Sequence, residues 1–531
     1  MELKTEIYEP LELSFSANGT VDDPYELRLA VVFTHEDGET LRVPGFWNGG
    51  RDWKVRVALP RPGQWRFRSE ASPSSGAGLH GLEGMVEAGS KAGEENPWLG
   101  RALRVAEDRS HLERADGTSF FWMGDTWWMA LCERLDDDGF ARLCRDRVEK
   151  GFNLVQLIVG PYPDMDAWDE RGRSPAGFPF TEGFHSVNPA FFQHADRRIR
   201  QLIDHGLVPC LVGMWGYYLD VVGAERVGRY WDYLVARYSA WPVVWCVAGE
   251  ADMPYYLSEQ FNVPEARQKQ KAGWTEIARR VRKADPHRRP LTIHPSNYAS
   301  SRDMVTDASV LDFEMLQTGH DDLAGVPRMI EVVERAVRTE PRLPVINSEV
   351  NYEGIMARSY ANVQRVCFAL SVLHGAAGFT YGANGLWQVD SRKKPYGISP
   401  HGRAWGEPTD WSEAAQLSGG TQVAALASRL ATLPWWRFRL HPEWCERPDA
   451  ESGEAFVIGV PEERLVWMSH CWNPVTIRQL EPGAAYRAEY WNPCSGAAIP
   501  LGTVRADADG CWTPPKPPAV HDWWLHLAQA P

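Results

Sequence analysis

Several features that would mark a membrane, nucleic-acid-binding or secreted protein are missing from this 531-residue sequence. No apolar run approaches the roughly 18 residues of a membrane-spanning helix. Basic residues are the minority, with 56 Lys and Arg against 70 Asp and Glu, which argues against nucleic acid as a partner because phosphates require a basic surface. The first residues contain no basic segment followed by an apolar one, so we expect no secretory signal.

Sequence patterns of metal, nucleotide and serine-dependent chemistry are missing as well. The nine cysteines are scattered without a C-x-x-C pair, which argues against a zinc site and predicts reduced thiols in a cytoplasmic protein. No glycine-rich phosphate loop follows an early strand, and no G-x-S-x-G motif occurs. A metal site remains a minor alternative despite the lack of H-x-H and H-E-x-x-H spacings, because strand-end His and Asp clusters also bind metals in barrel hydrolases. We therefore expect no cofactor.

The two ends of the chain show the pattern of β-domains. Alternating apolar and polar positions at 10–17, 25–34, 53–59 and 64–69 predict a β-sandwich over residues 1–95. Residues 83–96 are rich in Gly, Ser and Glu without periodicity, and we expect a linker or a long loop there. Strand-like segments at 456–460, 464–469, 486–490 and 523–527 predict a second β-sandwich over residues 438–531.

The middle of the chain, residues 96–437, alternates between short apolar runs and amphipathic segments. Eight such units in about 300 residues favour a (β/α)8 (TIM) barrel over an open sheet. The apolar runs lie at 120–124, 154–158, 208–214, 243–247, 291–294, 310–315, 345–348 and 378–381. Active residues of such barrels follow the carboxyl ends of the strands, so each strand end is a candidate position.

Two of these strand ends carry a glutamate each. Glu250 follows the fourth apolar run and Glu349 ends the seventh, so the two side chains are expected to face each other across the barrel mouth. Two facing carboxylates are what glycoside cleavage requires, one as proton donor and one to stabilise or capture the anomeric carbon. A helix cap or a surface ion pair is the alternative role for either glutamate alone.

Polar and aromatic residues at the other strand ends are the candidates for substrate binding. They are Asp125, Trp127, Trp128, Gln156, Tyr162, Trp215, His294, Gln317, His320, Tyr352, Tyr381 and Trp387. A helix cap is the alternative role for Asp125, and a buried structural amide is the alternative for Gln156. Tyr352 or Tyr381 could orient Glu349 through a hydrogen bond.

Tryptophan is the residue in excess, with 25 in the chain. About half lie in the flanking domains and are expected to pack in the sandwich cores. A smaller group at predicted strand ends and loops could stack on sugar rings, because an indole face matches the C–H face of a sugar. This group consists of Trp127, Trp128, Trp168, Trp215, Trp387 and Trp405.

Several of these segments resemble the apiosidase-like family of glycoside hydrolases (family 140). The resemblance lies in residues 120–128 (FFWMGDTWW), 150–156 (KGFNLVQ), 315–320 (MLQTGH), 347–354 (NSEVNYEG) and 380–382 (TYG). Residues 43–47 (VPGFW), 53–56 (WKVR) and 62–65 (PGQW) look like the β-sandwich that precedes many such barrels, and 491–493 (WNP) and 522–524 (DWW) are similar to the C-terminal sandwich often found with them.

The resemblance implies a (β/α)8 hydrolase that acts on glycosides of plant or microbial polysaccharides, with apiosides as the best-known substrates. Carried over by position, Glu250 matches the general acid/base and Glu349 the nucleophile. The family pattern has an aspartate after two glycines where this chain has Ala248, Gly249 and Glu250, and related retaining barrels have an asparagine at the position of Gly249. These departures leave the sugar open.

The sequence thus predicts a retaining glycoside hydrolase that cleaves a terminal bond in a plant- or microbe-derived oligosaccharide, such as an apioside or another pentofuranoside. The alternative is a non-catalytic carbohydrate-binding or scaffold protein on a degenerate barrel. We expect carbohydrate, and neither nucleic acid nor membrane, as the partner. The oligomeric state is open, and a flanking sandwich could serve as the interface of a homo-oligomer.

Overall fold

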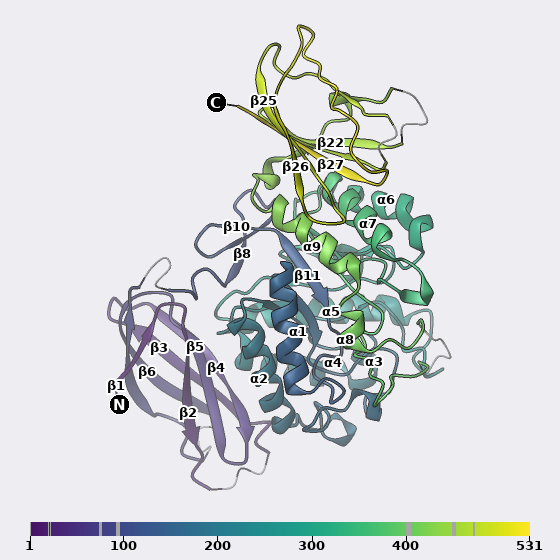
Figure 1. The fold of residues 1–531 in the computed structure, drawn as a ribbon. Helices are drawn as coiled ribbons and strands as arrows, with labels where there is room; N and C mark the ends of the chain where they lie inside the picture. The colour runs from purple at the N-terminus through teal and green to yellow at the C-terminus, as the bar shows by residue number, and fades with distance from the viewer. Residues whose placement is uncertain are drawn as a thin grey trace.

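The computed structural model describes residues 2–19, 21, 23–73, 77–91, 96–399, 405–448, 453–470 and 473–530. The chain folds into a central α/β region between two β-rich regions, one from each end of the sequence (Figure 1). Within the described part of the chain, no helix combines the length and the apolar character that crossing a membrane requires.

The N-terminal region is a seven-stranded sheet in the order β1-β7-β6-β3-β4-β5-β2. Strand β4 changes partner along its length, pairing with β3 up to Pro44 and with β5 from Gly45 onward. Large apolar side chains such as Trp53 and Trp65 are buried in its core. The strands are β1 (Glu2–Glu6), β2 (Pro10–Ser16), β3 (Arg28–His35), β4 (Thr40–Gly49), β5 (Asp52–Ala58), β6 (Gly63–Ser72) and β7 (Glu83–Gly89).

Strand β7 corrects one prediction from the sequence. The segment expected to be a linker begins with this strand, which pairs with β6 and with β1, and residues 92–95 of the segment lie outside the described residues. Val86 and Ala88 are buried at alternate positions, so the period-2 pattern is present, but it is too short to stand out among Gly and Glu.

The central region contains a nine-stranded sheet in which eight strands run parallel. Its order, β15-β14-β13-β12-β11-β19-β18-β17-β16, brings the first predicted strand next to the last. The parallel strands are β11 (Trp122–Thr126), β12 (Leu154–Ile158), β13 (Val208–Val212), β14 (Val244–Cys246), β15 (Leu291–Thr292), β17 (Glu314–Gln317), β18 (Val345–Glu349) and β19 (Gly378–Tyr381), and the short β16 (Ala299–Ser300) runs antiparallel to β17.

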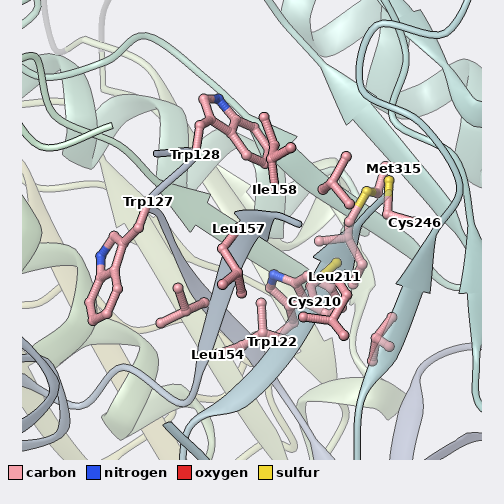
Figure 2. Close-up of a cluster of buried hydrophobic side chains, with 14 of the residues drawn as sticks. Trp122, Trp127, Trp128, Leu154, Leu157, Ile158, Cys210, Leu211, Cys246 and Met315 are labelled. Carbon is pink, nitrogen blue, oxygen red and sulfur yellow. The ribbon is translucent and has the colours of Figure 1, made fainter. Parts of the chain in front are cut away.

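The two ends of this ladder approach each other, so the sheet is curled as in a barrel. The backbone N–H of Asp312 donates to the carbonyl of Leu291 at 2.9 Å, and Thr292 Oγ1 donates to the carbonyl of Phe313 at 2.8 Å. The predicted runs at 154–158 and 378–381 coincide with β12 and β19. Leu154, Leu157 and Leu211 are among the buried apolar side chains of the sheet drawn in Figure 2.

Helices cover the outside of the curled sheet (Figure 1). The ends of the first helix, α1, follow from its sequence. Asp136 caps the N-terminus by accepting from the N–H of Gly139, and Gly151 ends the helix in a left-handed conformation at φ 101°. The helices are α1 (Asp137–Lys150), α2 (Pro189–Asp204), α3 (Tyr218–Val222), α4 (Ala224–Tyr238), α5 (Ala266–Ala284), α6 (Val326–Arg338), α7 (Ala361–Leu373), α8 (Trp411–Ala414) and α9 (Ser418–Leu430).

The C-terminal region is a six-stranded sheet in the order β20-β22-β23-β27-β25-β26, accompanied by the two-stranded pair β21 and β24. The four segments predicted from the sequence appear in it, whereas β26 was not predicted because its proline and glycine interrupt the alternation. The strands are β20 (Arg439–Leu440), β21 (Cys445–Glu446), β22 (Ala455–Val460), β23 (Glu463–Met468), β24 (Thr476–Ile477), β25 (Ala485–Trp491), β26 (Ala498–Arg505) and β27 (Trp523–Gln529).

Buried ion pairs join the N-terminal region to the central one. Arg56 of β5 contacts Asp196 of α2 at 2.5 Å and donates to the backbone carbonyl of Arg237 at 2.9 Å. Arg237 of α4 also pairs with Asp196, at 2.7 Å. The Arg56 guanidinium lies over the rings of Phe46 and Trp241, 5.0 and 4.5 Å from their centroids. The charges buried at this junction are therefore paired with charges of the opposite sign.

Candidate active site

Glu250 and Glu349 lie in one pocket at the carboxyl ends of the parallel strands. Glu349 is the last residue of β18, and Glu250 follows β14 by four residues. The pocket has a volume of about 590 Å³, within the usual range for small-molecule sites. Its lining consists of Trp128, Pro163, Asp164, Trp215, Glu250, Met253, Tyr256, Asn297, Gln317, His320, Asp321, Glu349, Tyr352, Ile355, Met356, Trp387 and Trp405.

Gln317, the last residue of β17, holds the two carboxylates together. Its amide nitrogen donates to Glu250 Oε1 and to Glu349 Oε1, each at 3.0 Å. Because both oxygens lie 3.0 Å from the same nitrogen, they are at most about 6 Å apart. The side chain of Gln317 is almost fully buried, so this bridge is shielded from water.

Histidines surround Glu349. His320 Nε2 lies within hydrogen-bond distance of Glu349 Oε1, at 3.1 Å. His294 Nε2 lies 3.2 Å from Glu349 Oε2, but this contact does not have the angles of a hydrogen bond. Burial by itself would raise the pKa of Glu349, but the contacts with the two imidazoles outweigh it and hold this pKa well below its ordinary value. Glu349 is therefore ionised at neutral pH.

Glu250 has the opposite environment. Its Oε2 accepts from Trp215 Nε1 at 3.3 Å, and no cation contacts it among the described residues. Burial, together with repulsion from Glu349, raises the pKa of Glu250 to about 8. Glu250 is thus largely protonated at neutral pH and able to donate a proton.

The backbone at Glu250 is strained, and its neighbour is tightly packed. Glu250 has φ 37°, a left-handed conformation that non-glycine residues rarely adopt and that concentrates at functional sites. A Cβ at Gly249 would lie 2.2 Å from the indole of Trp215. The glycine is therefore required for Trp215 to reach the carboxyl group of Glu250.

Aromatic rings form much of the remaining wall. Trp128 Nε1 donates to the hydroxyl of Tyr352 at 2.9 Å, and its ring packs edge-on against Trp215 and His294. Trp387 stacks on Tyr352 with ring centroids 6.2 Å apart. Of the predicted binding residues, Trp128, Trp215, Gln317, His320, Tyr352 and Trp387 line the pocket, and His294 contacts Glu349 from behind it.

Asp125 and Trp127 do not reach the pocket, which corrects their predicted roles. The Asp125 carboxylate is fully buried and accepts from Arg147 Nε at 2.5 Å and from Trp127 Nε1 at 2.7 Å. Trp127 packs against Phe140. Successive residues point to opposite sides of an extended chain, and Figure 2 shows the indoles of Trp127 and Trp128 pointing apart.

Four further predicted residues have structural positions. Gln156 is fully buried and donates to the carbonyl of Ser348 at 3.0 Å. Tyr162 is also buried and lies outside the pocket lining. The hydroxyl of Tyr381 donates to Glu353 at 2.6 Å and not to Glu349, so it is Tyr352 that lies beside the strand-end carboxylate. Trp168 packs against Phe178 and Phe184, outside the pocket.

Several lining residues were not singled out from the sequence. Asp164 accepts from Trp405 Nε1 at 2.9 Å and from the hydroxyl of Tyr256. Trp405 was among the candidate sugar-stacking tryptophans, but Asp164, Tyr256 and Asp321 lie on loops without periodicity. The available signal for Asp164 was its position six residues after the end of β12.

No group of three or more His, Cys, Asp or Glu residues in the described ranges is arranged to hold a metal ion. A smaller cavity of about 210 Å³ lies where α6 and α7 approach β20 and β22, and Glu334 is the only carboxylate among its lining residues. The facing pair of one protonated and one ionised carboxyl group, which glycoside cleavage requires, therefore belongs to the larger pocket.

The fold is similar to that of solved glycoside hydrolase structures. A candidate glycoside hydrolase of Bacteroides vulgatus ATCC 8482 superposes with a TM-score of 0.72 at 20% identity, covering 99% of this chain and 100% of that chain. A glycoside hydrolase family 5 structure from the same organism gives a TM-score of 0.68 at 22% identity, over 81% of this chain and 94% of that one. A third structure, described as a glycoside hydrolase, gives 0.67 at 22% identity, over 82% and 98%.

Family models match two parts of the sequence. Residues 4–72 match a domain of unknown function (DUF5060), and residues 106–437 match the apiosidase-like catalytic domain. No curated protein matches the chain. The second match covers more than half of the sequence and contains both Glu250 and Glu349. The chain therefore belongs to the apiosidase-like family and is a glycoside hydrolase.

Proposed function

We propose that this glycoside hydrolase acts with retention of configuration and releases a terminal sugar from a plant- or microbe-derived oligosaccharide. Glu349 attacks the anomeric carbon, and Glu250 protonates the leaving oxygen. After the leaving group departs, Glu250 takes a proton from water, which then displaces the sugar from Glu349.

The close approach of the two carboxylates is the observation that carries this proposal. Retaining enzymes have carboxyl groups about 5–5.5 Å apart, whereas inverting enzymes need about 6.5–9.5 Å to fit a water molecule. The shared hydrogen-bond donor on Gln317 limits the two facing oxygens to about 6 Å, which favours direct attack by Glu349. The opposite shifts in pKa support Glu250 as the acid and Glu349 as the nucleophile.

The substrate-binding roles follow from the same pocket. Trp128, Trp215 and Trp387 offer ring faces to a sugar, while Gln317, His320 and Tyr352 contact or flank Glu349. The family match supports an apioside or another pentofuranoside as the sugar. Glu250 is one methylene longer than the aspartate of the family pattern, which supports a different sugar or leaving group from that of the best-known members.

The architecture is part of the proposal. Eight parallel strands with contacts between β15 and β17 support a (β/α)8 barrel over residues 96–437. The partner change of β4 supports a β-sandwich over residues 1–95, and the sheet with its separate pair β21 and β24 supports a second one over residues 438–531.

Product stereochemistry tests the mechanism directly. A panel of α- and β-configured aryl furanosides and pyranosides identifies an active substrate, and proton NMR of the first turnovers then reports the anomer released. We expect the anomer of the substrate to appear first, and Glu349→Gln to release none. Release of the opposite anomer would contradict retention, and absence of turnover on every glycoside would favour a non-catalytic carbohydrate-binding protein.

A further inference from the structure

The ring of His320 is held beside Glu349 without a second hydrogen bond of its own. Its Nε2 lies 3.1 Å from Glu349 Oε1, whereas its buried Nδ1 has no hydrogen-bond partner among the described residues. In functional histidines the other ring nitrogen commonly makes a hydrogen bond that sets the state of the imidazole. Here the ring packs against Tyr352, with centroids 4.7 Å apart, and its remaining orientation must come from the backbone that carries it.

That backbone is joined to the loop after β18 by the side chain of Asn351. The N–H of Asp322 donates to Asn351 Oδ1 at 2.8 Å, and Asn351 Nδ2 donates to the carbonyl of Asp322 at 3.3 Å. A side-chain amide both accepts and donates, so it can pair with the two backbone groups of a single residue. Asn351 is 4% exposed and follows Glu349 by two residues, and Asp322 follows His320 by two. The bridge therefore lies directly behind the two interacting side chains.

The carboxylate of Asp322 adds a second connection between the same two loops. Asp322 has φ 59°, a left-handed conformation that is uncommon for a residue other than glycine. Its Oδ2 accepts from the backbone N–H of Ser359 at 2.8 Å and from the Ser359 hydroxyl at 3.1 Å. The neighbouring Arg358 donates to the carbonyl of His320 at 3.2 Å. The loop of His320 is thus fastened to the loop after β18 at several points.

A separate contact holds the other side of the His320 loop. The hydroxyl of Tyr298 donates to Asp321 Oδ2 at 2.7 Å. Gly319 has φ 83°, and a Cβ at this position would lie 2.6 Å from the ring of Tyr298. Because this contact is independent of Asn351, loss of the Asn351 bridge should displace His320 only in part.

We propose that Asn351 and Asp322 are positioning residues of the hydrolase reaction: they lock the loop that carries His320 to the loop that follows Glu349, and so hold the imidazole on the proposed nucleophile. The inference rests on the role proposed above for Glu349. Neither Asn351 nor Asp322 is among the residues that line the pocket, so their effect on the reaction is carried by His320.

A double-mutant cycle with His320 separates positioning from stability. kcat/KM is measured at neutral pH, on an aryl glycoside that the wild type cleaves, for the wild type, His320→Gln, Asn351→Leu and the double variant. Leucine keeps the branched shape of the asparagine side chain but neither donates nor accepts. We expect Asn351→Leu to cost about tenfold in the wild-type background and less than about twofold in His320→Gln, because the imidazole that it positions is already absent there.

Asn153 provides a matched control at the opposite ends of the strands. It precedes β12, and its amide accepts from the N–H of Met123 at 3.0 Å and donates to the carbonyl of Phe121 at 2.8 Å. This is the same kind of bridge between a side-chain amide and the backbone. Asn153→Leu should lower the melting temperature, and any loss of folded enzyme should reduce kcat/KM by the same factor in both backgrounds.

Asp322→Asn is a milder variant that carries the test if Asn351→Leu does not fold. Asparagine tolerates the left-handed backbone of Asp322, but it cannot accept from both Ser359 and the N–H of Leu323 as the carboxylate does. We expect Asp322→Asn to cost about threefold in the wild-type background and to have no further effect in His320→Gln.

The acidic limb of kcat/KM gives a readout that a purely structural role would not move. The titratable and charged groups that face Glu349 are His294, His320, Glu250 and Tyr352, with Asp321, Asp322 and Arg358 on the loops around His320. Since His320 lowers the pKa of Glu349, its displacement in Asn351→Leu should raise that pKa and move the limb to higher pH, by less than in His320→Gln.

The outcomes distinguish this proposal from the proposed function. An equal loss in both backgrounds, no loss in either, or an acidic limb that stays in place in Asn351→Leu would overturn the positioning role while leaving the hydrolase activity intact. Failure of the proposed function would appear instead as turnover by Glu349→Gln, or as a wild type that cleaves no glycoside in the panel.

Discussion

Glu250 and Glu349 share one pocket and one hydrogen-bond donor, yet the two halves of the pocket differ in polarity and charge. The Glu349 side contains two histidines, whereas the Glu250 side contains an indole N–H and further acidic groups. Two identical side chains thereby acquire pKa values on opposite sides of neutrality. The surroundings, and not the residue type, thus set the two pKa values, which is the basis for the proposed roles of acid and nucleophile.

Removing the nucleophile should have the largest effect. Glu349→Gln keeps the size of the side chain and its place beside Gln317 but cannot form the covalent intermediate, so we expect kcat to fall by about 10⁴-fold or more. Turnover is measured with an aryl glycoside, and circular dichroism checks that the variant is folded. Activity similar to the wild type would remove Glu349 from the mechanism.

Removing the acid should have a smaller effect that depends on the substrate. Glu250→Gln should reduce turnover of a substrate with a poor leaving group by about 10²–10⁴-fold. The loss should be much smaller for a 2,4-dinitrophenyl glycoside, whose leaving group needs no protonation. An equal loss on both substrates would show that Glu250 does not donate the proton.

The same glutamate sets the alkaline limit of activity. The pKa of Glu250 is raised to about 8, so its proton is present below that pH and is lost above it. We expect kcat/KM of the wild type to fall as the pH rises through about 8, and this limb to be absent in Glu250→Gln. A wild-type limb near the ordinary pKa of a glutamate would contradict the described environment.

Replacing a histidine beside Glu349 should move the acidic limb of the pH profile of kcat/KM. His320 lowers the pKa of Glu349, so His320→Gln should raise that pKa and shift the acidic limb of kcat/KM upward by roughly one unit. His441→Gln serves as the control because His441 pairs with Glu443 in the C-terminal region, at 2.9 Å. A limb that stays in place in His320→Gln would leave the ionisation of Glu349 to other groups.

Substitution of Asp125 should leave catalysis by the folded enzyme unchanged. It is a buried carboxylate of the same region, but it pairs with Arg147 and not with the pocket. Asp125→Asn leaves Arg147 partly uncompensated, and breaking a buried ion pair costs about 3–5 kcal/mol. We therefore expect a lower melting temperature with kcat/KM unchanged below it. A large increase in KM at unchanged stability would restore Asp125 to the binding site.

The sequence was informative wherever short-range pattern determines position. The apolar runs predicted strands close to those observed, and a glutamate directly after a strand in a parallel sheet must lie at its carboxyl edge. This logic placed Glu250, Glu349, His294, Gln317 and His320 together in the pocket region. It failed for Trp127, which was expected in the pocket together with Trp128. Adjacent residues of an extended chain point to opposite sides, and only Trp128 faces the pocket.

Long-range partners explain the remaining errors. Tyr381 was a candidate to orient Glu349, but Glu353 lies nearer because it pairs with the loop after β19. Asp164 and Tyr256 are 92 residues apart, and no periodicity links two loops at that distance. Loop residues that meet only through the fold leave no local pattern from which to predict the contact.

The junction at Arg56 has a consequence for how much of the chain is needed to carry the chemistry. The residues around the pocket all come from the central region, but two of its helices contribute Asp196 and Arg237 to a charge network that Arg56 completes. A fragment that began after the N-terminal sheet would keep every pocket residue but expose the pair of Asp196 and Arg237, together with the ring of Trp241, to water. The N-terminal sheet thus covers charged and aromatic surface of the central region although it contributes no residue to the pocket lining.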